Sequence, residues 1–179
     1  MKKILTLTLI SLMTLSAAVA QRVGYVDSNK IMEQIPEYKA AQDEIERVSQ
    51  KWQKELEAQY QNIEKLYKDY QEQEVLLPED VRVARQEEIF QAEREAKEYR
   101  EKKFGYNGEL FALQESKVKP VQDQVMRSVE KVAQKKRYDF VFDKAGEVTW
   151  MYTNNLYDLT NDVLVDMGLL DESGAPTRE

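Results

Sequence analysis

The fold is decided by residues 37–80, which read EYKAAQDEIERVSQKWQKELEAQYQNIEKLYKDYQEQEVLLPED. Their apolar side chains recur at intervals of three and four, the spacing that places one stripe along a helix. The stripe consists of Tyr38, Ala41, Ile45, Val48, Trp52, Leu56, Tyr60, Ile63, Tyr67 and Tyr70. Pro78 interrupts the pattern, and a helical period then resumes as far as about Arg137. This arrangement predicts two long antiparallel helices joined at a turn, a hairpin with little interior of its own.

The two arms of this hairpin match in length. Residues 37–74 and 80–117 each hold 38 positions, which corresponds to roughly 57 Å of helix at 1.5 Å per residue. Pro78 fits the first turn of the returning helix, where its missing N–H is not needed. Pro120 follows the point at which the partner arm ends, and we expect it to kink or interrupt the helix there. The helical residues after Pro120 should then form a separate stretch that packs elsewhere.

Two glycines, Gly105 and Gly108, lie within the returning arm, where each costs about 1 kcal/mol relative to alanine. Three interpretations are open. The glycines allow close contact between helices, they form a soft joint at which the arm bends, or they are tolerated weak points without a function. Gly105 and Gly108 are therefore our candidate hinge residues.

The ends of the chain have the pattern of β-structure. Alternating side chains in Val23–Asp27 predict a short strand. Residues 138–143 and 147–152, separated by a three-residue turn, predict a β-hairpin. A last helix should follow Asp158 as its cap and end at Gly168. The expected fold is thus mostly α with a small β body.

Three short strands cannot easily bury themselves against one short helix. Association of several copies, with the strands closed into one barrel-like body, would remove the exposed edges, although the pattern does not fix the number of copies. We assign residues 21–36 and 118–170 to this body and residues 37–117 to the helical hairpin. The side chains expected to build the oligomeric body are Val23, Tyr25, Val26, Phe140, Val141, Phe142, Val148 and Trp150.

Residues 1–20 have the pattern of an export signal. Two lysines precede a short apolar stretch, and Ala18–Ala20 supplies small residues for cleavage. The apolar stretch is too short to span a bilayer, and the absence of cysteine excludes a lipoprotein anchor. We therefore expect cleavage after Ala20 and an exported, periplasmic protein. At the other end of the chain, the composition of residues 171–179 predicts a disordered tail.

Composition argues against several classes of function. Without Lys2 and Lys3, 24 basic residues face 33 acidic ones, a net charge of −9. This balance disfavours nucleic acid and strong direct binding to an anionic membrane. The chain contains no histidine and no cysteine, which excludes Cys–His and Ser–His nucleophiles and the usual zinc sites. A carboxylate pair could act as acid and base, but the hairpin offers no concave site for it. We expect no enzymatic activity, no metal and no cofactor.

Several blocks of sequence carry a resemblance: Arg22–Ser28 with Ile35–Tyr38, Tyr138–Asp143, and Tyr157–Thr160 with Val163–Leu164. In this order, and with a long charged hairpin between them, they resemble the Skp/OmpH family of periplasmic chaperones. The resemblance covers essentially the whole mature chain and rests on order and architecture, because no single motif is catalytic. It implies a jellyfish-shaped homotrimer with a small β-barrel body and three helical tentacles around a cavity. It also implies an ATP-independent holdase that keeps unfolded outer-membrane proteins from aggregating.

Charge is the point at which this chain departs from the family pattern. Residues 37–117 carry 14 basic and 20 acidic side chains, whereas well-known members of the family are basic. Lipopolysaccharide binding at a basic tentacle patch is therefore not carried over, and client contacts should depend on apolar and aromatic groups. Our candidates are Tyr60, Tyr67, Tyr70, Leu76, Leu77, Phe90, Phe104 and Phe111. Phe104 and Phe111 lie off the helical spacing, which favours an exposed role. The alternative is a structural coiled-coil adaptor of the cell envelope that binds a folded partner through one apolar patch.

Overall fold

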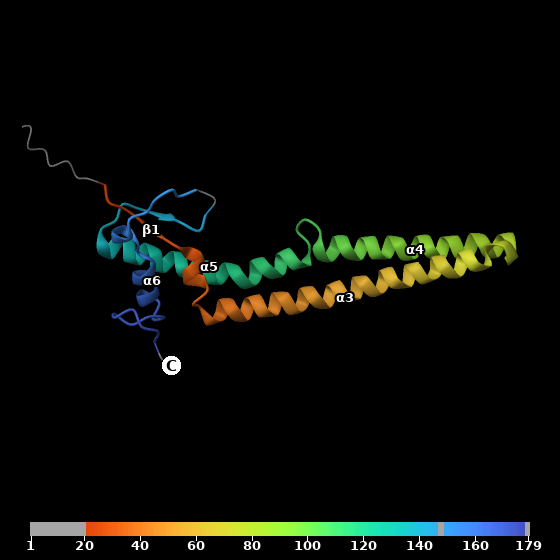
Figure 1. The fold of residues 1–179 in the computed structure, drawn as a ribbon, viewed down its shortest axis with the longest axis horizontal. Helices are drawn as coiled ribbons and strands as arrows, with labels where there is room; N and C mark the ends of the chain where they lie inside the picture. The colour runs from red at the N-terminus through yellow and green to blue at the C-terminus, as the bar shows by residue number, and fades with distance from the viewer. Residues whose placement is uncertain (1–20, 147–148, 178–179) are drawn as a thin grey trace, which may run out of the picture.

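A computed structural model describes residues 21–146 and 149–177 (Figure 1). The expected signal peptide, Val148 and the last two residues lie outside the described residues. The chain forms a long helical arm that projects from a small body, and both ends of the described chain lie at the body (Figure 1). It is mostly helical with one small sheet, as expected.

The arm has two antiparallel sides, one formed by a single helix and the other by two helices in succession. Helix α3 (Pro36–Gln73) runs outward with Pro36 at its first turn, and the one-turn helix η1 (Glu74–Leu76) leads to Pro78, directly before the return. Helices α4 (Glu79–Phe104) and α5 (Glu109–Lys136) run back toward the body. The predicted hairpin and its turn are confirmed. Along the arm the buried apolar side chains are Ala41, Ile45, Ile63, Ile89 and Ala96, so the helices share only a narrow seam.

The returning arm is interrupted at a different place from the one we predicted. Pro120 lies inside α5, which continues through it, so our expectation of a separate stretch after Pro120 was wrong. The proline is exposed to solvent, and water can therefore satisfy the carbonyl that loses its amide partner. The interruption lies instead at Gly105–Gly108, which loops out between α4 and α5 on the side away from α3 (Figure 1).

Close backbone contacts explain why glycine occupies both ends of this loop. A Cβ atom at Gly105 would lie 2.3 Å from the carbonyl oxygen of Glu101, and one at Gly108 would lie within 3.0 Å of three carbonyl oxygens. The φ angles of −69° and −68° are accessible to any residue, so the constraint is space and not a left-handed backbone. The close contact involves the chain's own preceding turn and not the facing helix. A role as a hinge stays a prediction.

The body contains a two-stranded parallel sheet. Strand β1 (Val23–Val26) pairs with β2 (Phe140–Asp143), with Val23 opposite Phe140 and Val26 opposite Asp143. An isolated bridge from Tyr25 to Asp158 occupies the other edge of β1. The expected β-hairpin was wrong, because residues 149–152 form no strand. Trp150 instead places its ring near Tyr25 and Phe142, at centroid distances of 6.3 and 6.0 Å.

The hydrophobic core of the protein lies in the body. Helix α2 (Ser28–Met32) and helix α6 (Thr160–Asp166) pack against the inner half of α5, and the one-turn helix η2 (Asn155–Tyr157) contacts β1. The most completely buried large side chains are Ile31, Ile35, Leu159 and Val163. Ser128 of α5 donates a hydrogen bond to Asp166 at 2.8 Å, and Lys131 pairs with the same carboxylate at 2.6 Å. Helix α5 therefore belongs to the arm at its start and to the body at its end.

Residues 171–177, for which we expected disorder, form a turn. The Asp171 carboxylate accepts hydrogen bonds from the backbone of Ser173 and Ala175, at 2.8 and 2.9 Å. The Thr177 hydroxyl donates to the carbonyl of Gly168 at 2.6 Å. The Ser173 hydroxyl also donates to the Asp171 carboxylate at 2.6 Å, and the bonds that this carboxylate accepts, chiefly the one from that hydroxyl, lower the pKa of Asp171. An acidic side chain placed before small residues is thus enough to close a local turn.

We predict that Gly105→Ala destabilises the protein by about 1–3 kcal/mol, because the added methyl overlaps backbone that cannot move freely. Chemical unfolding followed by circular dichroism measures this free energy. Gly146→Ala is the matched control, since a Cβ there would meet its nearest neighbour at an ordinary 3.5 Å. Equal free energies of unfolding for the two variants would show that the loop has no such constraint.

Candidate functional site

The surface of the arm, and not an enclosed cavity, carries the candidate site. Among residues 21–146 and 149–177, no cluster of acidic side chains is placed to hold a metal ion. No helix within these same ranges is long and apolar enough to cross a membrane. What the arm does offer is a groove between α3 and α4 near its outer end. We call this the tip groove, and its lining residues are Tyr67, Tyr70, Val83, Gln86, Glu87, Ile89, Phe90 and Glu93.

The tip groove has an apolar floor that is open to solvent. Ile89 is buried, while Val83 and Phe90 remain 56% and 58% exposed. At the turn beyond the groove, Val75 and Leu76 are 94% and 83% exposed. An ordinary helix pair would turn such side chains into its seam. Their exposure extends the apolar surface from the groove to the end of the arm.

Hydrogen bonds hold the two tyrosines of the groove. The Tyr67 hydroxyl donates to Glu93 across the helix pair at 2.9 Å. The Tyr70 hydroxyl donates to Glu74 at 3.0 Å and accepts from Gln86 at 2.8 Å. The bond to Glu93 raises the pKa of Tyr67, and partial burial raises the pKa of Tyr70. Both phenols therefore remain neutral at physiological pH, and their rings form polar-edged walls.

A second cluster lies beside the interruption of the arm. The Lys103 ammonium sits 4.5 Å from the centroid of the Trp52 ring and forms an ion pair with Glu109 across the loop. Phe104 meets the same indole edge-on, at 6.3 Å between ring centroids. Partial burial, together with a hydrogen bond to Glu55, raises the pKa of Tyr99 to about 12. This cluster joins the end of α4 to α3 and to the start of α5.

The predicted contact residues divide into two groups. Leu76, Phe90, Phe111, Tyr60 and Tyr67 are exposed, whereas Tyr70, Leu77 and Phe104 are half-buried. The expectation of an exposed Phe104 was wrong, because that ring packs against Trp52.

Our list of candidate client-contact residues did not include Val75, Val83 and Tyr106, which are also exposed. Tyr106, on the loop between α4 and α5, is 99% exposed. A signal for Val83 was present in the sequence, since it lies off the apolar spacing, as Phe111 does.

The body presents a different surface. Of the residues assigned to it, Tyr25 and Val26 are buried and Val141 and Trp150 are half-buried. Val23, Phe140 and Phe142 are exposed by 44–50%, and they are neighbours on the two strands. Nearby, Met151, Tyr152 and Leu156 are exposed by 75–94%. This is a large apolar surface for so small a body.

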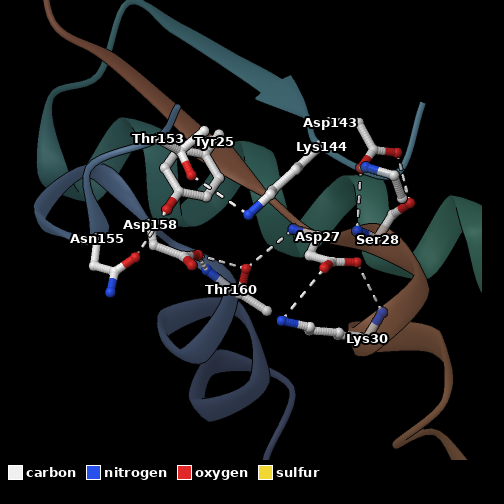
Figure 2. A network of polar contacts seen from close by, with 11 residues as sticks. Tyr25, Asp27, Ser28, Lys30, Asp143, Lys144, Thr153, Asn155, Asp158 and Thr160 are labelled. Carbon is white, nitrogen blue, oxygen red and sulfur yellow. Dashed lines mark hydrogen bonds and ion pairs between the residues drawn. The ribbon is translucent and has the colours of Figure 1, made fainter. Parts of the chain in front are cut away.

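Polar contacts lock the parts of the body together, as Figure 2 shows. Asp143 accepts hydrogen bonds from the Ser28 amide and hydroxyl at 3.1 and 2.5 Å. The Asp27 amide donates to the Thr160 hydroxyl oxygen at 3.0 Å, and that hydroxyl donates to Asp158. Three segments far apart in the sequence are thereby fixed around β1. Neutral groups donate to Asp143 and Asp158, and Asp27 pairs with Lys30 at 3.5 Å. The network has the character of a structural support.

Comparison with known proteins gives consistent results. The family model described as outer membrane protein (OmpH-like) matches residues 22–167. The fold is similar to the crystal structure of a protein from Caulobacter crescentus CB15 that is described as an OmpH-like outer membrane chaperone. The TM-score is 0.64 at 13% sequence identity, over 91% of this chain and 94% of the other. No curated protein matches the sequence.

We predict that Lys103→Ala lowers the free energy of unfolding by about 1–2 kcal/mol at pH 7, because the ammonium contacts both Trp52 and Glu109. Lys103 also lowers the pKa of Glu109 from its usual 4.5. A carboxylate whose pKa is lower in the folded than in the unfolded protein stabilises the fold at pH values above its unfolded pKa. This stabilisation is lost as the pH falls through the folded pKa. Part of the effect should therefore disappear below about pH 4.

The matched control is Lys102→Ala. Lys102 pairs with the same carboxylate at 3.6 Å but has a side chain that is 71% exposed, and exposed pairs contribute little. Thermal and chemical unfolding of the three proteins at pH 7 and pH 3.5 would test the difference. The assignment fails if both variants lose the same amount at both pH values.

Proposed function

This chain belongs to the OmpH-like outer membrane protein family, and we propose that it is an ATP-independent holdase chaperone of the periplasm. Its clients would be unfolded outer-membrane proteins, kept from aggregating while they are held beside the arms. One observation carries this proposal: apolar and aromatic side chains lie exposed along an arm that has almost no interior. Phe90 and Phe111 are at least half exposed, and Val75 and Leu76 are almost fully exposed.

Weak, repeated contacts suit this role. An unfolded chain offers apolar side chains at irregular spacing, and a long surface with scattered apolar groups can meet them without a defined pocket. No single contact needs to be strong, because several along the arm add together. Release then needs no nucleotide, since each contact can break separately. The described grooves are all open to solvent, in keeping with binding along a surface.

We further propose that three copies assemble through their bodies into a homotrimer with three arms around a common space. The support is the exposed apolar surface of the sheet, formed by Val23, Phe140 and Phe142, together with Met151 and Leu156. A two-stranded sheet is marginal by itself and gains stability when its faces and edges are covered by another copy. The mature protein would start after Ala20, following export.

The competing proposal is a structural adaptor of the cell envelope. An adaptor would bind one folded partner at a single apolar patch. The exposed apolar groups lie at several places along the arm, from Phe111 near the body to Leu76 at the turn. This spread favours a holdase, because a single folded partner would leave much of it uncovered.

We predict that the mature protein suppresses aggregation of several unfolded outer-membrane barrel proteins at a few equivalents, without ATP. Light scattering after dilution of the client from urea measures this. Replacing Leu76 and Phe90 by serine should weaken the suppression several-fold, because the exposed apolar surface is reduced. A matched control replaces Gln53 and Gln61, which are exposed polar residues on the arm, by serine. Suppression of one client alone, with no effect on the others, would favour the adaptor.

We also predict a trimeric mass for the mature protein at micromolar concentration in multi-angle light scattering. Replacing Phe140, an exposed residue of β2, by aspartate should reduce the mass, because a buried charge opposes the contact between copies. Circular dichroism would verify that the variant keeps its helices. Thr149→Asp, a change at an exposed position near the sheet, is the control. A monomeric wild-type mass would remove the trimer from the proposal.

A further inference from the structure

We infer that the tip groove selects client segments in which apolar or aromatic residues are flanked by lysine or arginine. The inference rests on the proposed holdase function and adds a chemical preference to it. It comes from the tip groove as defined above, which combines an apolar floor with acidic residues at its rim. Neither feature alone would specify such a segment.

The apolar part of the groove would bind a side chain of the client. Val83 and Phe90 project from α4 with more than half of their surface exposed, above the buried Ile89. The rings of Tyr67 and Tyr70 form the walls and are held by their hydrogen bonds. Fixed aromatic walls bind apolar side chains at a low entropic cost, because they lose little freedom on binding.

The residues that line the tip groove include two glutamates and no lysine or arginine. Glu87 and Glu93 both line it, and neither forms an ion pair within the described part of the chain. Within residues 21–146 and 149–177, the one hydrogen bond to the Glu93 carboxylate comes from the neutral Tyr67 hydroxyl. The nearby arginines are already engaged, since Arg82 pairs with Glu79 and Arg85 with Glu88. Two carboxylates therefore face solvent beside an apolar surface.

Charge over the outer arm reinforces this local arrangement. Residues 60–95 contain ten acidic and five basic side chains. A segment with lysine or arginine would be attracted to this part of the arm, and an acidic segment would be repelled. A second copy of the arm would carry the same negative charge into the groove, and an anionic membrane would be repelled as well. Of the occupants that an apolar groove could accept, a basic and apolar segment fits both of its properties.

The expected size of the preference for basic segments is set by the free energy that exposed ion pairs contribute. Two such pairs, each within the range measured at protein surfaces, correspond to roughly a three- to tenfold gain in affinity. The gain should diminish at high salt, because exposed charges are screened over about 10 Å at 0.1 M ionic strength. Binding of the apolar residues should be much less sensitive to salt.

The test uses the mature protein, residues 21–179, and three fluorescent peptides with the same aromatic and aliphatic residues. The peptides differ only in their flanking residues, which are lysine, glutamine or glutamate. Fluorescence anisotropy at 20 and 300 mM salt measures their affinities. We expect the lysine peptide to bind about three- to tenfold more tightly than the glutamine peptide at low salt. The glutamate peptide should bind least tightly, and the differences should shrink at high salt.

The double variant Glu87→Gln, Glu93→Gln tests whether the preference for the lysine peptide arises in the tip groove. It keeps an acceptor for Tyr67, so the walls should stay in place, and it should bind the lysine and glutamine peptides almost equally. The control is Glu57→Gln, Glu98→Gln, which makes the same change in net charge at exposed positions of the arm outside the groove. The control should keep the preference. An equal loss in both double variants would overturn the inference, because net charge alone would then explain the selectivity.

The remaining outcomes are also decisive. If the three peptides bind wild type equally while aggregation is still suppressed, the inference fails and the holdase function stands. If the protein binds no peptide and suppresses no aggregation, the proposed function fails as well. Phe90→Ser should weaken the binding of all three peptides. If Phe90→Ser changes the mass of the assembly and leaves peptide binding intact, the groove is a contact between copies and the inference is overturned.

Discussion

The parallel pairing of β1 with β2 is the constraint on which the rest of the structure depends. Parallel neighbours cannot be joined by a tight turn and need a long crossover connection. In this chain the crossover connection is the whole arm, since the paired residues Arg22 and Asp139 lie 117 positions apart. The arm must therefore leave the body and return to it. Its outgoing and returning helices must therefore be antiparallel, and its outer end must be a turn.

Features set by local sequence were predictable. The spacing of apolar residues gives the helices, and Pro36 and Pro78 mark where the two sides of the arm start. The last helix ends before Gly168 as predicted, but its N-cap is Leu159 and not Asp158, whose carboxylate accepts a hydrogen bond from the Thr160 amide. Pro120 misled the prediction because its effect depends on which side of the helix it faces, and that depends on packing. Phe104 misled it because, at the last position of α4, its ring contacts Trp52 of α3, and helical spacing alone does not show such a contact. The pairing of β2 with β1 is non-local, and a hairpin was the simpler interpretation of two adjacent strand-like segments.

The candidate site was predictable only in part, for a related reason. Periodicity can identify which side chains fall outside a seam, and it indicated Phe111 in this way. It cannot show which seam residues stay exposed when two helices bury few side chains between them. Tyr67, at the wall of the tip groove, is such an exposed seam residue. The excess of acidic residues in the arm was visible in the sequence, but the pairing of these charges in space was not. The carboxylates without cationic partners, Glu87 and Glu93, stand out only when the ion pairs around the arginines are known.

The continuity of α5 has a mechanical consequence. The helix runs without interruption from Glu109 to Lys136, and Arg137 then closes it with a left-handed backbone, at φ 58°. Only Tyr138 and Asp139 separate this cap from β2 and the exposed ring of Phe140. The inner part of the arm is thus a helix attached directly to the sheet, and the predicted hinge at Gly105–Gly108 lies outside it. If the arm bends at that hinge, a load on the outer segment would be absorbed there, whereas a load on α5 would act as torque on the surface through which the copies would meet.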